Sequence, residues 1–479
     1  MLLSVCACTT VAPPPAPLLS MDVPPHWSAA DAAGAGAAGV SPSSLASWWQ
    51  RFDDPLLGDL VGSALQANTS VVGAQAALRQ SQAFRDLATA ALWPTLGSSA
   101  SAQRSTAGHS TGNSFRLGLD AAWTPDVFGA GRAAVDAGEA TVRASAASLG
   151  DLQVQIAAEV ALSYVLLRTA QARFAIAVDN LASQQETLQI TQWREQAGLV
   201  TSLESEQARA AAEQTRALLP ALQTSIEQTR HALAVLTGQV PTALAVTLAE
   251  TRPVPQADPA LALSIPAQTL RQRADVRAAE YQVAAALASV READARRWPS
   301  FAIGGSVGLS ALTAGALTNG GSVVSSLLAS VSWPVFDSGA ARAQVRVQQA
   351  ALDQAQQVYR AAVLGALKEV EDALIALSGD RQRLLSLRNA ADAAGNAALL
   401  ARQRYSSGLV DFQTVLETQR TQFGAQDSVA STSADVSGDL VRLFKALGGG
   451  WRSDLDPGAA DAARPAADLA TTATPSGPP

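Results

Sequence analysis

The chain has 479 residues, of which 48% are hydrophobic and 16% are charged, and its formal net charge is −7. This acidic balance argues against nucleic acid as a partner, because nucleic-acid binding needs a basic face. The three histidines are scattered, and the sequence has no phosphate-binding glycine loop and no G-x-S-x-G or H-E-x-x-H motif. The sequence therefore predicts no metal, no cofactor and no enzymatic activity.

Both cysteines, Cys6 and Cys8, stand at the start of the chain, and their absence elsewhere suits an oxidising compartment. The segment around them resembles the end of a bacterial lipoprotein signal, in which a small residue precedes the acylated cysteine. We expect Cys8 to carry the lipid, because Ala7 is the better preceding residue. The apolar stretch is short and has no basic start, so a complete signal peptide would begin upstream of Met1. No other segment has 18 uninterrupted apolar residues, so no transmembrane helix is expected.

The body of the chain falls into two halves with the same order of parts: an opening helix, two short alternating segments and two long helices. Two similar phrases, AAWTPDVFGAGRAAV (121–135) and VSWPVFDSGAARAQV (331–345), mark the same place in each half. The expected parts are a partial lipoprotein signal 1–8, an N-terminal tether 9–45, a first-repeat helix 46–92, a first strand pair 93–126, first-repeat long helices 127–238, a linker 239–263, a second-repeat helix 264–297, a second strand pair 298–336, second-repeat long helices 337–451 and a disordered tail 452–479.

An opening helix is expected in each half. In the first half, Asp54 can accept hydrogen bonds from free backbone amides, and Pro55 suits the first helical position. This helix is expected to run unbroken until the Trp-Pro pair at position 93, and the Trp-Pro pair at position 298 ends its counterpart.

Short alternating segments follow each opening helix. In residues 115–124 the odd positions are apolar and the even positions are small or polar. The same alternation recurs in 301–310 and 327–335, and more weakly in 93–103. The lengths suit tilted strands that cross a bilayer, but a soluble sandwich would also alternate, and the pattern alone favours neither. The connections STAGHSTGNS and SALTAGALTNGGS are expected to be exposed loops.

Two proline-free stretches, 126–219 and 335–456, carry apolar residues at steps of three, four or seven, which predicts long helices. A helix from Gly129 to about Ala197 would be about 100 Å long at 1.5 Å per residue. No globular core is that deep, so such helices need partners along their length, in a coiled coil or a tube of helices.

Each long helix is expected to reverse at a glycine, Gly198 in REQAGLV and Gly408 in RYSSGLV, because glycine adopts the left-handed conformation easily. Antiparallel helices are then expected at 201–237 and 412–446. Pro220 is expected to kink the first of them.

The strand-to-helix junctions place Asp126 and Asp337 where they can cap the long helices. Four strands are too few to close a sheet, and lipid does not tolerate unpaired strand edges, so closure must come from other copies of the chain. The predicted fold class is mainly α with transmembrane β-strands, internally duplicated, with long helical hairpins.

Four segments together resemble the TolC-like outer-membrane efflux protein family, in its lipoprotein (OprM/NodT-like) branch that serves resistance-nodulation-division pumps. They are WWQRFDDPLLGDL, RADVRAAE, WPVFDSGAAR and YSSGLVDFQTVLETQR, and the resemblance covers about residues 46–451. Ala274 departs from the proline that the family usually has there.

The resemblance implies a homotrimer whose twelve strands form one barrel in the bacterial outer membrane, with the paired helices forming a tube across the periplasm. It implies a lipid-anchored exit duct that passively conducts drugs, metals or other small solutes. The implied partners are a periplasmic adaptor, an inner-membrane pump and outer-membrane lipid. Phe115, Trp123, Phe301 and Trp333 would then face the membrane, the alternative being ordinary core packing.

The resemblance also suggests a gate at the periplasmic end, near Gly408. Three copies of Asp411 would form a ring that repels anions and binds cations. Arg404 and Tyr405 would hold the closed state through contacts with the neighbouring first-half hairpin, near Glu195 and Thr201. The alternative is that Asp411 only caps the helix that follows.

The rival function from another class is a periplasmic coiled-coil adaptor or structural scaffold protein. It would share the long helical hairpins. Two strand pairs bounded by Trp-Pro at a fixed spacing favour the channel.

Overall fold

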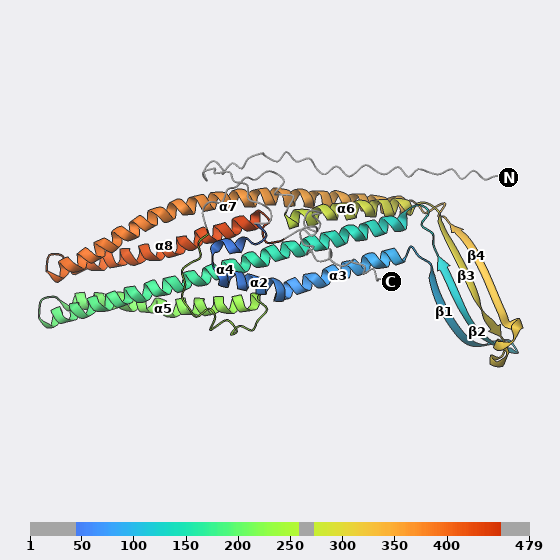
Figure 1. Ribbon diagram of the computed structural model, residues 1–479, viewed down its shortest axis with the longest axis horizontal. Coiled ribbons are helices and arrows are strands. Elements are labelled where there is room, and N and C mark those ends of the chain that lie inside the picture. Colours follow the sequence, from blue (N-terminus) through green and yellow to red (C-terminus); the bar gives the residue numbers. More distant parts are fainter. Residues whose placement is uncertain (1–44, 258–272, 452–479) are drawn as a thin grey trace, which may run out of the picture. The chain divides into compact units, whose positions relative to one another are not determined.

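The computed structural model describes residues 45–257 and 273–451 (Figure 1). The expected signal with Cys6 and Cys8, all of the tether except its last residue, and the whole tail lie outside these residues. The chain divides into two compact units. Of the described residues, the first unit contains 66–152 and 273–372, and the second contains 45–65, 153–257 and 373–451.

The first unit combines helices with one antiparallel sheet (Figure 1). Its helices are α3 (Thr69–Ala90), α6 (Ala274–Ala295) and the beginnings of α4 (Ala130–Gln196) and α7 (Ala340–Ser406). Its strands are β1 (Thr95–Ala107), β2 (Ser110–Trp123), β3 (Ser300–Ala311) and β4 (Val323–Ser332). Two short 3-10 helices, η4 (Ala314–Thr318) and η5 (Gly320–Ser322), connect β3 to β4.

The sheet has the strand order β1-β2-β3-β4, and every neighbouring pair is antiparallel. Its register places Leu117 beside Leu309 of β3, whereas the preceding residue, Arg116, lies beside Ser310. Successive side chains of a strand point to opposite faces. One face is therefore mostly apolar and the other is rich in hydroxyl groups, which confirms the predicted alternation.

One connection and the bounds of one strand in the sheet differ from the expectation. STAGHSTGNS is not a loop, because β1 and β2 continue through it as paired strands up to a two-residue turn at Gly108 and His109. Gly108 has a φ of 62°, a conformation that favours glycine. The last strand covers 323–332 rather than 327–335, and it ends before Pro334, because proline has no amide hydrogen to continue the ladder.

The opening helix of the first half is broken, so the expected unbroken helix is wrong. The helix α2 (Pro55–Ala67) ends just before Asn68, and α3 begins just after it. The Asn68 side-chain oxygen accepts a hydrogen bond from the Ser70 amide at 2.9 Å and caps the new helix. A short polar side chain that bonds the backbone in this way competes with helix continuation.

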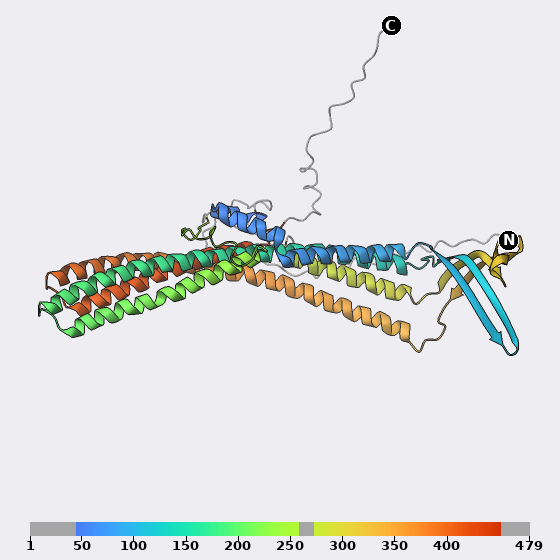
Figure 2. The same ribbon diagram turned by 90° about the horizontal axis from the view of Figure 1, so that it is seen from below.

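The second unit is built from α2, α5 (Ser202–Leu236), α8 (Phe412–Ala446) and the later parts of α4 and α7. Figures 1 and 2 show α4 with α5, and α7 with α8, as two antiparallel hairpins. The turns are formed at Gly198 and Gly408, with φ of 73° and 72°. In both turns the next leucine amide bonds a carbonyl five residues back, at 2.8 Å and 2.9 Å, which is the helix ending that glycine permits. The predicted fold class is confirmed, and α5 continues through Pro220.

The first described residues pack against the end of α8. The short helix η2 (Trp48–Phe52) places the fully buried Trp48 ring parallel to Phe444, with 5.4 Å between ring centroids. A Cβ atom on Gly449 would lie 2.9 Å from the Leu45 carbonyl oxygen, so only glycine allows this close approach. The amino-terminal segment is thereby fixed to the carboxyl-terminal helix.

Candidate functional site

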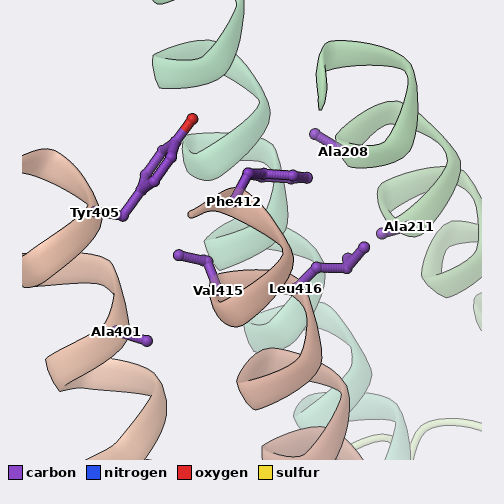
Figure 3. Packing of buried hydrophobic residues seen from close by; sticks show 7 residues of the cluster. All are labelled: Ala208, Ala211, Ala401, Tyr405, Phe412, Val415 and Leu416. Carbon is purple, nitrogen blue, oxygen red and sulfur yellow. The ribbon is translucent and has the colours of Figure 1, made fainter. Parts of the chain in front are cut away.

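The hairpin turns of the second unit meet in a buried apolar cluster (Figure 3). Tyr405 and Phe412 are 5% and 3% exposed, and their ring centroids lie 5.8 Å apart. The cluster joins residues from α5, α7 and α8, namely Ala208, Ala211, Ala401, Tyr405, Phe412, Val415 and Leu416. Both hairpins of one chain are therefore packed together close to their turns.

Polar contacts also fix Tyr405 to the first-half hairpin. The Arg194 guanidinium donates a hydrogen bond to the Tyr405 carbonyl oxygen at 2.7 Å and lies 4.4 Å from the centroid of its ring. The Tyr405 hydroxyl donates to the Glu204 carboxylate at 3.3 Å. Burial raises the pKa of the Tyr405 hydroxyl, which keeps this group protonated as a donor. Tyr405 is thus held by both α4 and α5.

Two of the expected gate residues, Tyr405 and Arg404, lie in different surroundings: the first is buried and the second is exposed. Tyr405 contacts Arg194 and Glu204 of its own chain, which lie close in sequence to the expected Glu195 and Thr201. Arg404 is exposed at the turn. Sequence reasoning missed Arg194, because a single arginine near a helix end is a common feature and gives no local signal.

Asp411 stands at the amino terminus of α8. Its carboxylate accepts hydrogen bonds from the Thr414 hydroxyl at 2.6 Å and from the Thr414 amide at 2.9 Å. These two bonds lower the pKa of Asp411 below its ordinary value. The capping alternative is therefore present in the structure, and the carboxylate remains exposed at the turn.

A seam of polar pairs connects α4 to α8. Arg173, Asn180 and Thr187 of α4 follow one another at intervals of seven residues, the spacing that returns to one face of a packed helix. Their partners on α8 are Asp427 (2.6 Å), Gln426 (2.9 Å) and Gln419 (2.9 Å), respectively. This spacing is the signal that could have revealed the seam, but polar residues on a long helix are usually solvated.

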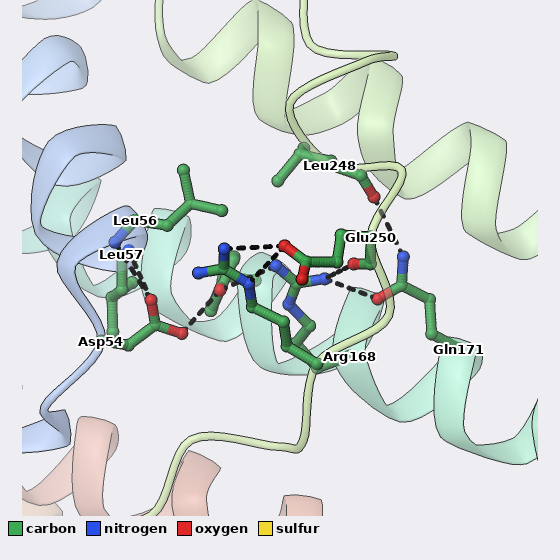
Figure 4. Close-up of polar contacts among 9 residues, drawn as sticks. Asp54, Leu56, Leu57, Arg168, Gln171, Leu248 and Glu250 are labelled. Atoms are coloured by element: carbon green, nitrogen blue, oxygen red, sulfur yellow. Dashed lines mark hydrogen bonds and ion pairs between the residues drawn. The ribbon is translucent and has the colours of Figure 1, made fainter.

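A second polar network in this unit fixes the segment after α5 to α4 (Figure 4). The predicted cap is present, since the Asp54 carboxylate accepts from the Leu56 amide at 3.0 Å. It also accepts from the Tyr164 hydroxyl at 2.6 Å. The fully buried Arg168 donates to that hydroxyl at 3.0 Å and to the Glu250 carbonyl oxygen at 2.6 Å. The expected linker that begins at residue 239 is thus tied to the helix pair.

Tyr164 makes the stability of this network dependent on pH. Burial and the bond to Asp54 raise the pKa of the Tyr164 hydroxyl from 10.0 to about 12. The stabilisation is present below pH 10 and is lost as pH rises from 10 through about 12. We therefore expect Tyr164→Phe to be less stable than the wild type at pH 8, and the difference between them to shrink above pH 10. Thermal unfolding followed by circular dichroism measures this difference, and Tyr281→Phe is the matched control. A constant difference between pH 8 and pH 12 would contradict the assignment.

The two strand-to-helix junctions are held by aspartates. Partial burial opposes the ionisation of Asp126, but the amides of Arg132 and Gly131 outweigh it and lower its pKa. The Arg132 amide lies 2.8 Å from the Asp126 carboxylate. Asp337 accepts from the Ala341 and Gly339 amides, both at 2.8 Å, and these bonds lower its pKa. Both carboxylates therefore satisfy free amides at the start of a long helix.

The apolar face of the sheet is uncovered in the single chain. Leu117, Val307 and Leu327 are 53%, 51% and 84% exposed. Phe115 and Phe301 lie on this same face according to the strand register. An exposed apolar surface of this extent marks a site of contact with other protein or with lipid.

Two tryptophans lie at the end of the apolar face where the strands meet the helices. Trp123 is 38% exposed and Trp333 is 55% exposed. Their indole nitrogens donate to the carbonyl oxygens of Leu92 at 2.9 Å and of Arg297 at 3.3 Å. Each ring therefore pairs a satisfied polar group with an exposed apolar body, which is how tryptophan lies at a boundary between lipid and water.

Some kinds of site are not found in the part of the chain that the structure describes. Within residues 45–257 and 273–451, no cluster of three or more histidine, cysteine, aspartate or glutamate side chains is arranged to bind a metal ion. None of the helices in these ranges combines the length and the apolar character needed to cross a membrane.

The chain is similar to outer-membrane proteins of known function over most of its length. A family profile described as outer membrane efflux protein matches residues 60–239 and 265–449. The pyoverdine export outer membrane protein OpmQ of Pseudomonas putida is 32% identical over 470 residues, which cover 94% of this chain and 96% of that protein. The solved outer-membrane channel OprN is 34% identical with a TM-score of 0.80, over 87% of this chain and 97% of its own. The outer membrane protein VceC of Vibrio cholerae is 27% identical with a TM-score of 0.77, over 85% of this chain and 99% of its own.

Proposed function

The chain belongs to the outer membrane efflux protein family, and from this premise we propose that three copies of it form one continuous conduit from the periplasm to the outside. It is an outer-membrane channel of an efflux system. This membership decides against the adaptor or scaffold alternative and against the soluble sandwich. The trimer, its partners and its gate are proposals that are added to this family membership.

The observation that carries the trimer is the open sheet. Among the described residues, β1 and β4 each pair with one neighbouring strand, so the sheet formed by these residues ends in two free edges. Free backbone groups cannot be left unpaired in lipid. Pairing β4 of one copy with β1 of the next removes every edge, and three copies give the twelve strands that the family resemblance implies. The apolar face then meets lipid and the hydroxyl-rich face meets water.

The long helices support the same assembly. Within the first unit, α7 leaves Val347, Val358 and Leu364 between 49% and 57% exposed. In the second unit, Ile375 and Leu385 of the same helix are 61% and 64% exposed. Apolar side chains distributed along a helix of 67 residues need partners along its whole length. Neighbouring copies of the chain supply them in a closed tube of helices.

The energy for export comes from outside the chain. We assign it to an inner-membrane pump that delivers solutes through a periplasmic adaptor, while the channel conducts passively and catalyses no reaction. Small organic solutes are the proposed cargo, since the similar protein OpmQ is named for pyoverdine export. Acylation at Cys8 would anchor the chain to the outer membrane in addition to its strands.

The proposed gate lies at the hairpin turns, and its charge is tested by a variant that keeps the cap. Serine caps a helix nearly as well as aspartate but carries no charge. We expect Asp411→Ser to weaken the block of single-channel current by Mg²⁺ added from the hairpin side, while Asp411→Ala additionally lowers the melting temperature because the helix cap is lost. Planar-bilayer recording and thermal unfolding measure the two effects. An unchanged Mg²⁺ block in Asp411→Ser would leave Asp411 as a cap alone.

A further inference from the structure

We propose that Arg116 and Asp120 form two charged bands inside the sheet-lined part of the conduit, and that the Arg116 band is a binding site for multivalent anions. This inference rests on the proposed trimer. It concerns a region far along the chain from the hairpin turns, and it assigns a role to charges on the hydroxyl-rich face of the sheet.

The four strands contain three charged residues, Arg104, Arg116 and Asp120. Arg104 lies opposite Asn113, which has the same parity on β2 as the apolar positions Phe115 and Leu117. Arg104 therefore belongs to the outward face, close to the turn at the strand ends. Arg116 and Asp120 have the opposite parity and belong to the hydroxyl-rich face.

The neighbours of the two charges are small. Arg116 lies between Ser101 of β1 and Ser310 of β3. Asp120 lies between Gly97 and Ser306 in the same way. Small side chains on both sides leave the guanidinium and the carboxylate standing above the surface that surrounds them.

The two bands are too far apart to neutralise each other directly. Four residues along an antiparallel strand span about 14 Å. Between them lies Gly118, opposite Gly308, where a Cβ atom on Gly308 would meet the Leu117 carbonyl oxygen at 2.5 Å. The close approach of β2 and β3 places two glycines side by side here, and the polar side chain nearest to them on this face is that of Ser99, opposite Gly118 on β1.

The local contacts leave Arg116 available. In the described ranges no aspartate or glutamate forms an ion pair with Arg116, and its side chain is exposed. Asp120, by contrast, accepts a hydrogen bond from the Ser99 hydroxyl at 2.9 Å. Arg116 is therefore a free donor fork, which is the chemistry that binds phosphate groups.

Closure of the barrel brings three copies of Arg116 to one level. A barrel of twelve tilted strands has a radius of about 12 Å, given strands about 4.8 Å apart and a tilt of about 40°. Three extended arginines then leave an opening on the order of 10 Å, which is similar to the screening length in physiological salt. Their field therefore acts across the whole opening, and one anion with several charges can contact more than one arginine.

The test uses tripolyphosphate as the probe on the full-length protein in planar bilayers. It is added on the side of the strand turns. We expect tripolyphosphate to block the wild-type current and Arg116→Gln to weaken that block at least about fivefold, as the loss of a charged hydrogen-bond donor predicts. Arg116→Lys keeps the charge and should retain most of the block, and Asp120→Asn should strengthen it.

The matched control is Arg104→Gln, which removes the same charge from the same pair of strands but on the opposite face. It should leave the block unchanged. An equal loss in Arg104→Gln and Arg116→Gln, or no loss in a conducting Arg116→Gln channel, would overturn this inference alone. A wild-type chain that forms no channel would overturn the proposed function, and this inference with it.

Discussion

Replacing Arg194 with alanine is expected to raise the time-averaged conductance of the channel by about tenfold, because a charged hydrogen bond of about 1.5–3 kcal/mol is removed from the hairpin turns and the closed state is less favoured. Arg194 joins α4 to the carbonyl oxygen and the ring of Tyr405 on α7, at 2.7 Å and 4.4 Å. Without it, Tyr405 keeps its hydrogen bond to Glu204, and the two hairpins remain joined by the apolar cluster and by the polar pairs between α4 and α8. Separation of the hairpins then becomes more frequent, and planar-bilayer recording detects it as longer or larger openings.

The matched control for Arg194 is Arg209→Ala. Arg209 lies on α5 and is 56% exposed, and it pairs only with Glu206 of its own helix in the ion pairs found here. Its removal changes the local charge equally but breaks no contact between the hairpins, so conductance should stay at the wild-type value. Equal effects of the two variants would mean that charge in general, and not the contact with Tyr405, controls opening.

Trp48→Ala is expected to lower the free energy of unfolding by about 3–5 kcal/mol, the usual cost of removing a large buried aromatic side chain. Trp48 is fully buried, lies parallel to Phe444 at 5.4 Å and also contacts Phe52 at 6.0 Å. Its loss opens a cavity where the amino-terminal segment meets the end of α8, and it releases that segment. Thermal unfolding in detergent and the rate of proteolysis near residue 45 measure the two consequences.

The neighbouring tryptophan provides the control for this effect. Trp49 is only partly buried and makes an edge contact with Trp48 at 5.8 Å. Trp49→Ala should therefore cost clearly less than Trp48→Ala. Equal losses of stability in the two variants would show that the burial of Trp48 does not fix the amino-terminal segment.

Periodicity was sufficient to predict the long elements of this chain. The break at Gly198 and the break at Gly408 could be located from sequence, because a long helix must end where glycine permits the reversal. The alternation of 115–124 also predicted which residues share a face, since a strand has a strict period of two. Repetition of each signal in the two halves strengthened it.

Features that depend on a single side chain were harder to predict. Asn68 divides one helix into α2 and α3 because its side chain caps the second, and an asparagine inside a helical pattern does not reveal this. The connection at Gly108 was expected to be an open loop, because its glycine and serine residues are common in loops. In the sheet these small residues pair regularly across β1 and β2.

The candidate site was predicted only in part for a physical reason. Tyr405 and Asp411 belong to a segment with a recognisable pattern, whereas Arg194 meets Tyr405 only after two hairpins more than 200 residues apart in sequence have packed together. The polar pairs between α4 and α8 leave only the seven-residue spacing of Arg173, Asn180 and Thr187 in the sequence, and this spacing does not identify their partners on α8.

The central claim is that the sheet edges of separate copies pair and close one membrane barrel. The mass and the location of the protein test this claim most directly. The chain is expressed behind a complete signal peptide, extracted from the outer-membrane fraction in detergent and measured by light scattering, with a gel run before and after heating. We expect light scattering to give the mass of a trimer. We expect the band of the unheated sample to change its migration on the gel after heating, because heating unfolds the assembly. A monomer or dimer in the soluble fraction would contradict the barrel, because the free edges of β1 and β4 would then never meet in a membrane.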